Sequence, residues 1–169
     1  GGGALQLASL QSAWGIGIVA GGLVLGVWGG FRRRTVTSLI GVLGMGLAFV
    51  IVGLTPPSAM GVAAAAIFVA GFMNPIANGP LFATVQAIVA PEMQGRVFML
   101  LGSVAAAATP LGLIIAGPVA DAVGVSTWFV VGGLAATLMG ILGFLLPEVL
   151  YLEDNHAHLT GTSTGVAQG

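Results

Sequence analysis

Residues 35–91 read TVTSLIGVLGMGLAFVIVGLTPPSAMGVAAAAIFVAGFMNPIANGPLFATVQAIVAP, and this stretch contains no charged residue. A helix needs about 20 apolar residues to cross a hydrocarbon core of about 30 Å, so the stretch is too long for one membrane-crossing helix. It divides at Thr55-Pro56-Pro57-Ser58, because paired prolines remove backbone donors and favour a turn. We therefore expect two helices here, over residues 36–54 and 59–89.

The charged residues outside this stretch mark the limits of three further apolar runs, over residues 10–31, 97–120 and 127–146. These limits are set by Arg32–Arg34, Glu92, Arg96, Asp121 and Glu148. Each run has the length of a transmembrane helix. The sequence thus predicts an all-α polytopic membrane protein with five transmembrane helices. We expect a transmembrane bundle over residues 1–152 and a flexible cytoplasmic tail over residues 153–169.

The composition excludes a water-soluble domain. Apolar residues make up 57% of the chain and charged residues 5%, whereas an average globular domain is about 25% charged. Mean hydropathy is +1.08, so we expect the lipid bilayer to be the main surroundings of the chain. Four arginines and no lysine cannot form a basic groove, which argues against nucleic acid as a partner.

The arginines predict the orientation of the bundle. Arg32–Arg34 follow the first predicted helix and Arg96 follows the third, so all four lie on the same side. The positive-inside rule makes this side cytoplasmic, together with the C-terminal tail. The N-terminus then lies outside. An outside start without an initiator Met, followed by an odd number of helices, leads us to expect a fragment of a longer protein.

The predicted helix over residues 59–89 holds the most informative polar residues. Pro75 and Pro80 remove the hydrogen bonds to the carbonyls of Gly71 and Ile76, and we expect the helix to break there. Asn74, Asn78 and Gln86 carry amides that are costly to leave unpaired in hydrocarbon. They are either interhelical hydrogen-bonding groups or the polar wall of a substrate pathway at a broken helix.

Two further features concern the packing of the helices. Pro110 and Pro118 predict breaks or kinks in the fourth helix. Glycines spaced by four in the first helix give three small-xxx-small pairs, which are Gly17/Gly21, Gly22/Gly26 and Gly26/Gly30. Such pairs let helices approach closely, either as fixed packing or as a sliding surface.

The sequence argues against an enzyme. The middle of each apolar run lacks Asp, Glu, Lys, Arg and His, so no Ser/His or Asp/Asp pair can form within the membrane. We therefore expect no catalytic residue and no cofactor. His156 and His158 are too few ligands for a metal site, and we expect no metal.

Three segments resemble the major facilitator superfamily, specifically its macrolide-efflux-type drug exporters. GLVLGVWGGFRRR at residues 22–34 resembles the basic loop between the second and third helices of a half. PEMQGRVF at residues 91–98 resembles the loop after the tenth helix, and GPVADAVG at residues 117–124 resembles the end of the eleventh. The order and spacing fit helices eight to twelve, in the C-terminal half of a twelve-helix transporter.

This resemblance implies a transporter of the cell membrane that exports small amphipathic compounds or drugs by alternating access. Its partners would be the small-molecule substrate and a missing N-terminal six-helix half. It implies a cytoplasmic gate at Arg32, Arg33, Arg34 and Arg96. The family's basic loop carries an Asp ahead of its arginines and this sequence has none, so the alternative is that the arginines only determine topology.

Two questions stay open at this stage. Protons are a candidate coupling ion, but these runs hold no titratable group away from their ends, so a proton-carrying group would have to lie in the other half. The alternative to a transporter is a membrane scaffold or assembly subunit that binds partner helices without transport.

Overall fold

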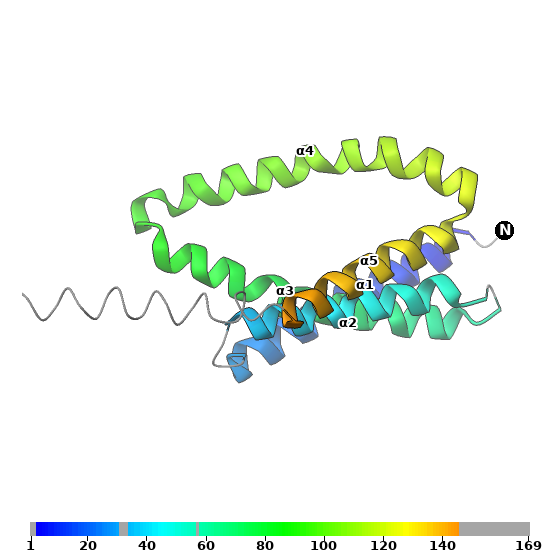
Figure 1. The fold of residues 1–169 in the computed structure, drawn as a ribbon, viewed down its shortest axis with the longest axis horizontal. Coiled ribbons are helices and arrows are strands. Elements are labelled where there is room, and N and C mark those ends of the chain that lie inside the picture. The colour runs from blue at the N-terminus through cyan, green and yellow to red at the C-terminus, as the bar shows by residue number, and fades with distance from the viewer. Residues whose placement is uncertain (1–2, 31–33, 57, 146–169) are drawn as a thin grey trace, which may run out of the picture.

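The computed structural model describes residues 3–30, 34–56 and 58–145. Arg32 and Arg33 lie outside these ranges, as do Glu148, His156, His158 and the tail predicted over residues 153–169. Within the described ranges the chain forms helices and no strand (Figure 1). The helices are α1 (Ala4–Trp28), α2 (Arg34–Leu54), α3 (Met60–Ile88), α4 (Pro91–Val123) and α5 (Val125–Leu145).

All five described helices are suited to a bilayer. They contain between 21 and 33 residues, and each has an apolar window with a mean hydropathy of 1.6 or more. At 1.5 Å per residue, even the shortest extends roughly 30 Å, the thickness of a hydrocarbon core. The chain is therefore an all-α multi-pass membrane protein, which confirms the predicted fold class.

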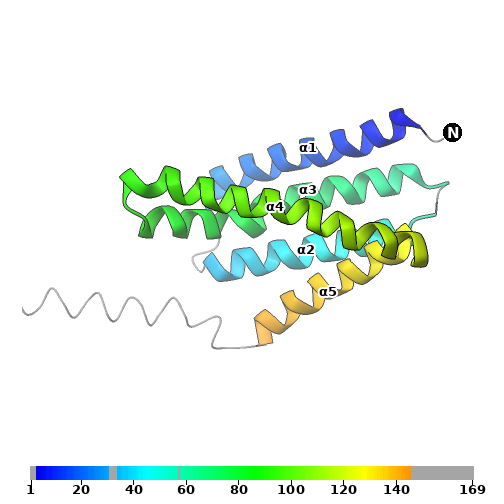
Figure 2. The same cartoon turned by 90° about the horizontal axis from the view of Figure 1, so that it is seen from above.

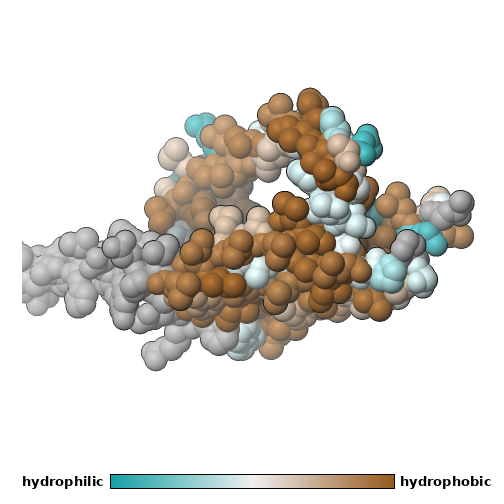
Figure 3. Space-filling view, turned by 45° about the vertical axis from the view of Figure 1, so that its right-hand side comes forward, coloured by the Kyte–Doolittle hydropathy of each residue, from teal (hydrophilic) through white to brown (hydrophobic). Residues whose placement is uncertain are grey.

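Four of the helices form a layer, and the fifth leaves it. The layer has the order α1, α3, α2, α5, with α3 packed against both α1 and α2 (Figure 2). In contrast, α4 passes over the layer and contacts it chiefly through α5. No described residue of α4 is buried. Figure 3 shows an opening between α4 and the layer, bordered largely by apolar residues.

Glycine allows α1 to lie directly on α3. A Cβ atom at Gly21 would collide with the main-chain carbonyl of Phe72, and one at Gly17 with that of Phe68. At Gly22 and Gly26, by contrast, a Cβ atom would meet nothing within 4 Å. Successive helix residues differ by about 100° in direction, so Gly22 cannot share the face of Gly21. Of the three predicted glycine pairs, only Gly17/Gly21 packs against another helix within the described chain.

The third predicted pair, Gly26/Gly30, is wrong because Gly30 lies beyond the end of α1. Gly29 and Gly30 have φ angles of 75° and 77°, a left-handed conformation that glycine adopts without steric cost. The N–H of Gly29 donates to the carbonyl of Leu25 at 2.7 Å and ends the helix.

Small residues also bring α2 close to both of its neighbours. A Cβ atom at Gly41 would lie 2.8 Å from the Cβ of Ala77 in α3. On the opposite side, a Cβ atom at Gly46 would lie 2.9 Å from the carbonyl oxygen of Gly133 in α5. Backbone contact at this range gives the dispersion energy on which helix association in lipid depends.

The prolines do not break the helices as predicted. α3 continues through Pro75 and Pro80, and α4 continues through Pro110 and Pro118. Each proline removes one backbone donor, and the remaining hydrogen bonds hold the helix together while it bends. The C-terminal part of α3 turns away from α1 and α2 to reach α4 (Figure 1).

The connections on either side of α4 are shorter than predicted. α4 begins at Pro91 rather than near residue 97, because proline fits the first turn of a helix and Glu92 favours its positive end. The predicted loop over residues 121–126 contracts to Gly124, whose φ of 87° lets the chain reverse between α4 and α5.

Candidate functional site

The candidate site is built around α3, which contacts a different neighbour on each side. Phe68 and Phe72 lie against α1, while Met73 and Ala77 lie against α2. Two other faces of α3 remain between these contacts. At about 100° per residue, one of them carries Asn74 and Asn78, and the other carries Pro80 and Ala83.

Asn74 and Asn78 are both half-buried. Nδ2 of Asn78 donates to the main-chain carbonyl of Asn74 at 3.0 Å, so this amide is satisfied within its own helix. In the part of the chain that the structure describes, the Asn74 amide has no hydrogen-bond partner. Neither side chain bonds to another described helix.

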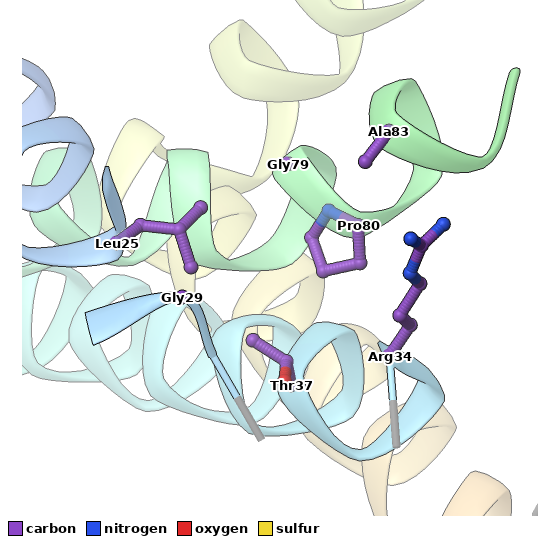
Figure 4. A pocket seen from close by; sticks show the side chains of 7 residues that line it. All are labelled: Leu25, Gly29, Arg34, Thr37, Gly79, Pro80 and Ala83. Atoms are coloured by element: carbon purple, nitrogen blue, oxygen red, sulfur yellow. The ribbon is translucent and has the colours of Figure 1, made fainter. Parts of the chain in front are cut away.

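The opposite face of α3 borders a cavity of about 170 Å³ where α3 diverges from its neighbours. Figure 4 shows the side chains of Pro80 and Ala83 above the cavity, with Thr37 and Arg34 of α2 below it. Thr37 is only 1% exposed. The remaining lining residues are Leu25, Gly29 and Gly79.

A short hydrogen-bonded chain lies beside this cavity. Nη1 of Arg34 donates to Oγ1 of Thr84 at 3.5 Å, and the Thr84 hydroxyl donates to the carbonyl of Pro80 at 2.8 Å. The first residue of α2 is thereby joined to the bend of α3. Two of the four arginines predicted at the gate, Arg34 and Arg96, lie in the described chain. Arg34 lines this cavity, whereas Arg96 is exposed and does not.

Gln86 is the third residue of the predicted substrate pathway, and it lies about two turns beyond Asn78 in α3. Its side chain is exposed near the end of α3, and its main-chain carbonyl accepts a hydrogen bond from Nε2 of Gln94 at 3.0 Å. Nε2 of Gln94 also donates to the carbonyl of Val89 at 3.1 Å. Gln94 thus satisfies carbonyls that the end of α3 leaves free, and it holds the turn from α3 into α4.

Sequence reasoning missed Thr37, Thr84 and Gln94. Thr84 lies four residues after Pro80, the spacing at which a hydroxyl reaches a helix carbonyl, and this signal was available. The contact of Arg34 with Thr84 had no local signal, because the two residues are 50 positions apart.

The described residues do not bring metal-binding or acidic side chains together. No group of three or more His, Cys, Asp or Glu residues gathers among them. Their two acidic residues, Glu92 and Asp121, lie near opposite ends of α4 and are separated by roughly 40 Å along the helix.

The chain is similar to three proteins named for efflux. It is 30% identical to macrolide efflux protein A of Streptococcus pyogenes over 149 residues, which are 88% of this chain and 37% of that protein. It is 35% identical to the multidrug efflux pump Tap of Mycolicibacterium fortuitum over 150 residues, which are 88% of this chain and 36% of that protein. It is 30% identical to macrolide efflux protein A of Enterococcus faecalis over 109 residues, which are 64% of this chain and 34% of that protein.

The chain spans little more than a third of the length of these relatives. No protein-family model matches the chain, and no solved structure matches it significantly. The resemblance to efflux proteins that the sequence motifs indicated is confirmed by these similarities, which cover most of the chain.

Proposed function

We propose that this chain, a homologue of part of macrolide and multidrug efflux proteins, forms most of the C-terminal half of a twelve-helix exporter of major facilitator type. Its five described helices would correspond to helices eight to twelve. The exporter would act by alternating access, in which two bundles move about a binding site near the middle of the membrane. An N-terminal six-helix half would be the second bundle.

The proposal for the substrate pathway rests on Asn74 and Asn78. They occupy one of the two faces of α3 that lie between its contacts with α1 and α2. Pro80 and Ala83, on the opposite face, point toward the ends of α1 and α2 (Figure 4), so the two amides are turned away from them, toward the side on which α4 lies. An amide at that depth needs water, a ligand or a partner helix, because hydrocarbon cannot pair with it.

The substrate class follows from the surroundings of these amides. The rest of this face of α3 includes Ile67, Leu81 and Val85, and the helices around it are almost entirely apolar. Small-molecule sites are typically apolar with a few placed polar groups. We expect small amphipathic compounds, whose apolar body contacts this wall and whose polar group meets the amides.

The arginines would lie at the cytoplasmic gate. Arg34 is at the start of α2 and Arg96 follows the turn from α3 to α4, and both places lie at the same end of the bundle (Figure 1). The positive-inside rule would make this end cytoplasmic, with the C-terminus on the same side of the cell membrane. If protons drive export, the proton-carrying group would lie in the other half.

A membrane scaffold is the second candidate, and the exposure of α4 favours it. Apolar residues such as Ile114, which is 69% exposed, are available to any partner helix. A scaffold would use the same surface without a substrate pathway.

The two candidates are distinguished by drug accumulation in cells that produce the intact protein containing this chain. We expect these cells to accumulate less of a fluorescent amphipathic cation and less of a radiolabelled macrolide than cells with an empty vector. Dissipation of ion gradients should abolish the difference, because secondary export depends on them. Accumulation equal to that of the vector control, at verified membrane abundance, would contradict the exporter and favour the scaffold.

A further inference from the structure

The cavity beside Arg34 is not part of the face that carries Asn74 and Asn78, and it has a different chemical character. Its volume of about 170 Å³ corresponds to roughly six water molecules in the liquid. Leu25, Pro80 and Ala83 give it apolar walls. A compact group that carries polar oxygens and an attached apolar chain would fit such a space.

The charge at this cavity is not neutralised within the described chain. Arg34 makes its one described hydrogen bond to the neutral hydroxyl of Thr84, and the bond is long at 3.5 Å. No carboxylate among the described residues pairs with Arg34, and the first turn of α2 contains no acidic residue. A guanidinium at a cavity without an acidic partner attracts an anion.

The position of the cavity places it within reach of lipid headgroups. Arg34 is the first residue of a membrane-crossing helix, so the cavity lies at the depth of the lipid headgroups. Basic pockets between transmembrane helices are a known type of headgroup site. The N-terminal end of α2 adds a partial positive charge on the same side.

We propose that this cavity binds a phosphate group, with the Arg34 guanidinium as its main ligand, between the ends of α1 and α2 and the bend of α3. The phosphate would come from the headgroup of an anionic lipid or from free phosphate. An anionic lipid would place its headgroup at Arg34 and its acyl chains in the surrounding bilayer. The proposal does not depend on transport, because it uses none of the residues assigned to the substrate pathway.

Binding is measured on the intact protein, purified in a neutral detergent, by native mass spectrometry with phosphatidylglycerol or phosphatidylcholine. Arg34→Gln removes the charge, and Ala83→Leu fills the cavity while every arginine remains. Arg96→Gln is the matched control, because Arg96 lies at the same end of the bundle but does not line the cavity. Circular dichroism and size-exclusion chromatography check that each variant is folded.

We expect Arg34→Gln to weaken the binding of phosphatidylglycerol about fivefold, the effect of one arginine near a lipid surface. Ala83→Leu should weaken the binding as well, because the larger side chain occupies the cavity. Arg96→Gln should leave the binding unchanged, and phosphatidylcholine should bind more weakly to the wild type. Inorganic phosphate identifies the source: if it displaces phosphatidylglycerol, the site takes free phosphate as well, and if it does not, the lipid headgroup is the ligand. Equal losses for Arg34→Gln and Arg96→Gln, or unchanged binding in Ala83→Leu, would overturn the proposal.

Discussion

Arg34 at the start of α2 donates a hydrogen bond to Thr84 near the end of α3, across 3.5 Å and 50 residues of sequence. The Thr84 hydroxyl in turn donates to the carbonyl of Pro80 at 2.8 Å, so Arg34 is linked to the bend of α3 through two hydrogen bonds. Two helices that diverge at one end of the bundle are thereby joined at the point of divergence.

Replacing Thr84 tests whether this connection stabilises the bend. Thr84→Val keeps the shape of the side chain and removes both hydrogen bonds, whereas Thr84→Ser retains the hydroxyl. We expect Thr84→Val to lower the free energy of unfolding by about 0.5–1 kcal/mol, the usual size of such a bond between membrane helices. Unfolding in mixed micelles measures this. Equal stability of the valine and serine variants would show that the connection contributes nothing.

Adjacent glycines in α1 should respond in opposite ways to the same substitution. Gly21→Ala places a methyl group against the main-chain carbonyl of Phe72, which cannot move aside without shifting α3. We expect a loss of about 1–3 kcal/mol in stability, as for other overpacked interfaces. Gly22→Ala meets nothing within 4 Å and should be neutral or stabilising by up to about 1 kcal/mol.

The measurement for the two glycines is again unfolding in mixed micelles, with the two variants compared side by side. Both substitutions change glycine to alanine in the same helix, so helix propensity cancels between them. Similar stabilities for the two variants would mean that α1 does not lie on α3 in the way described.

Gln94 should control the turn between α3 and α4. Gln94→Leu frees the carbonyls of Gln86 and Val89, and we expect amide hydrogen exchange over residues 88–94 to accelerate. Gln86→Leu is the matched control, because Gln86 takes part through its main chain and its side chain is exposed. Hydrogen exchange with mass spectrometry distinguishes the two variants. Equal acceleration in both would contradict the role assigned to the Gln94 amide.

The orientation of the helices can be tested with introduced cysteines, because this chain has none of its own. Ser58→Cys lies between α2 and α3, and Ser126→Cys lies at the start of α5. Both should react with a membrane-impermeant maleimide from outside the cell. Glu92→Cys, in the first turn of α4, should react only after the membrane is permeabilised. Labelling of all three from one side would contradict five crossings.

The number of helices could be predicted because hydropathy in a bilayer is a local property. The run over residues 35–91 had to contain two crossings, and its double proline marked the turn. The start of α4 was predicted too late, although Pro91 and Glu92 are ordinary signals of a helix N-terminus. Those signals were outweighed by the charged residues, which suggested a loop.

The packing could not be predicted to the same extent, because it depends on which helices become neighbours. The sequence presents Gly17, Gly21, Gly22 and Gly26 as equivalent members of a repeated spacing. Only the position of α3 distinguishes the pair that is covered from the pair that is not. The cavity at Arg34 likewise requires the bend of α3 and the start of α2 to meet, which no local pattern encodes.

The central claim is that Asn74 belongs to a substrate pathway. The most direct test is to measure how fast the intact protein carrying Asn74→Leu exports a fluorescent amphipathic cation. The control is Thr109→Val on α4, which removes a hydroxyl bonded within its own helix at 3.1 Å. We expect Asn74→Leu to lower export about three- to tenfold, the loss of one hydrogen bond to the substrate, at unchanged membrane abundance. Thr109→Val should export at the wild-type rate. Wild-type export by Asn74→Leu, or a loss of membrane abundance as large as the loss of export, would contradict the claim.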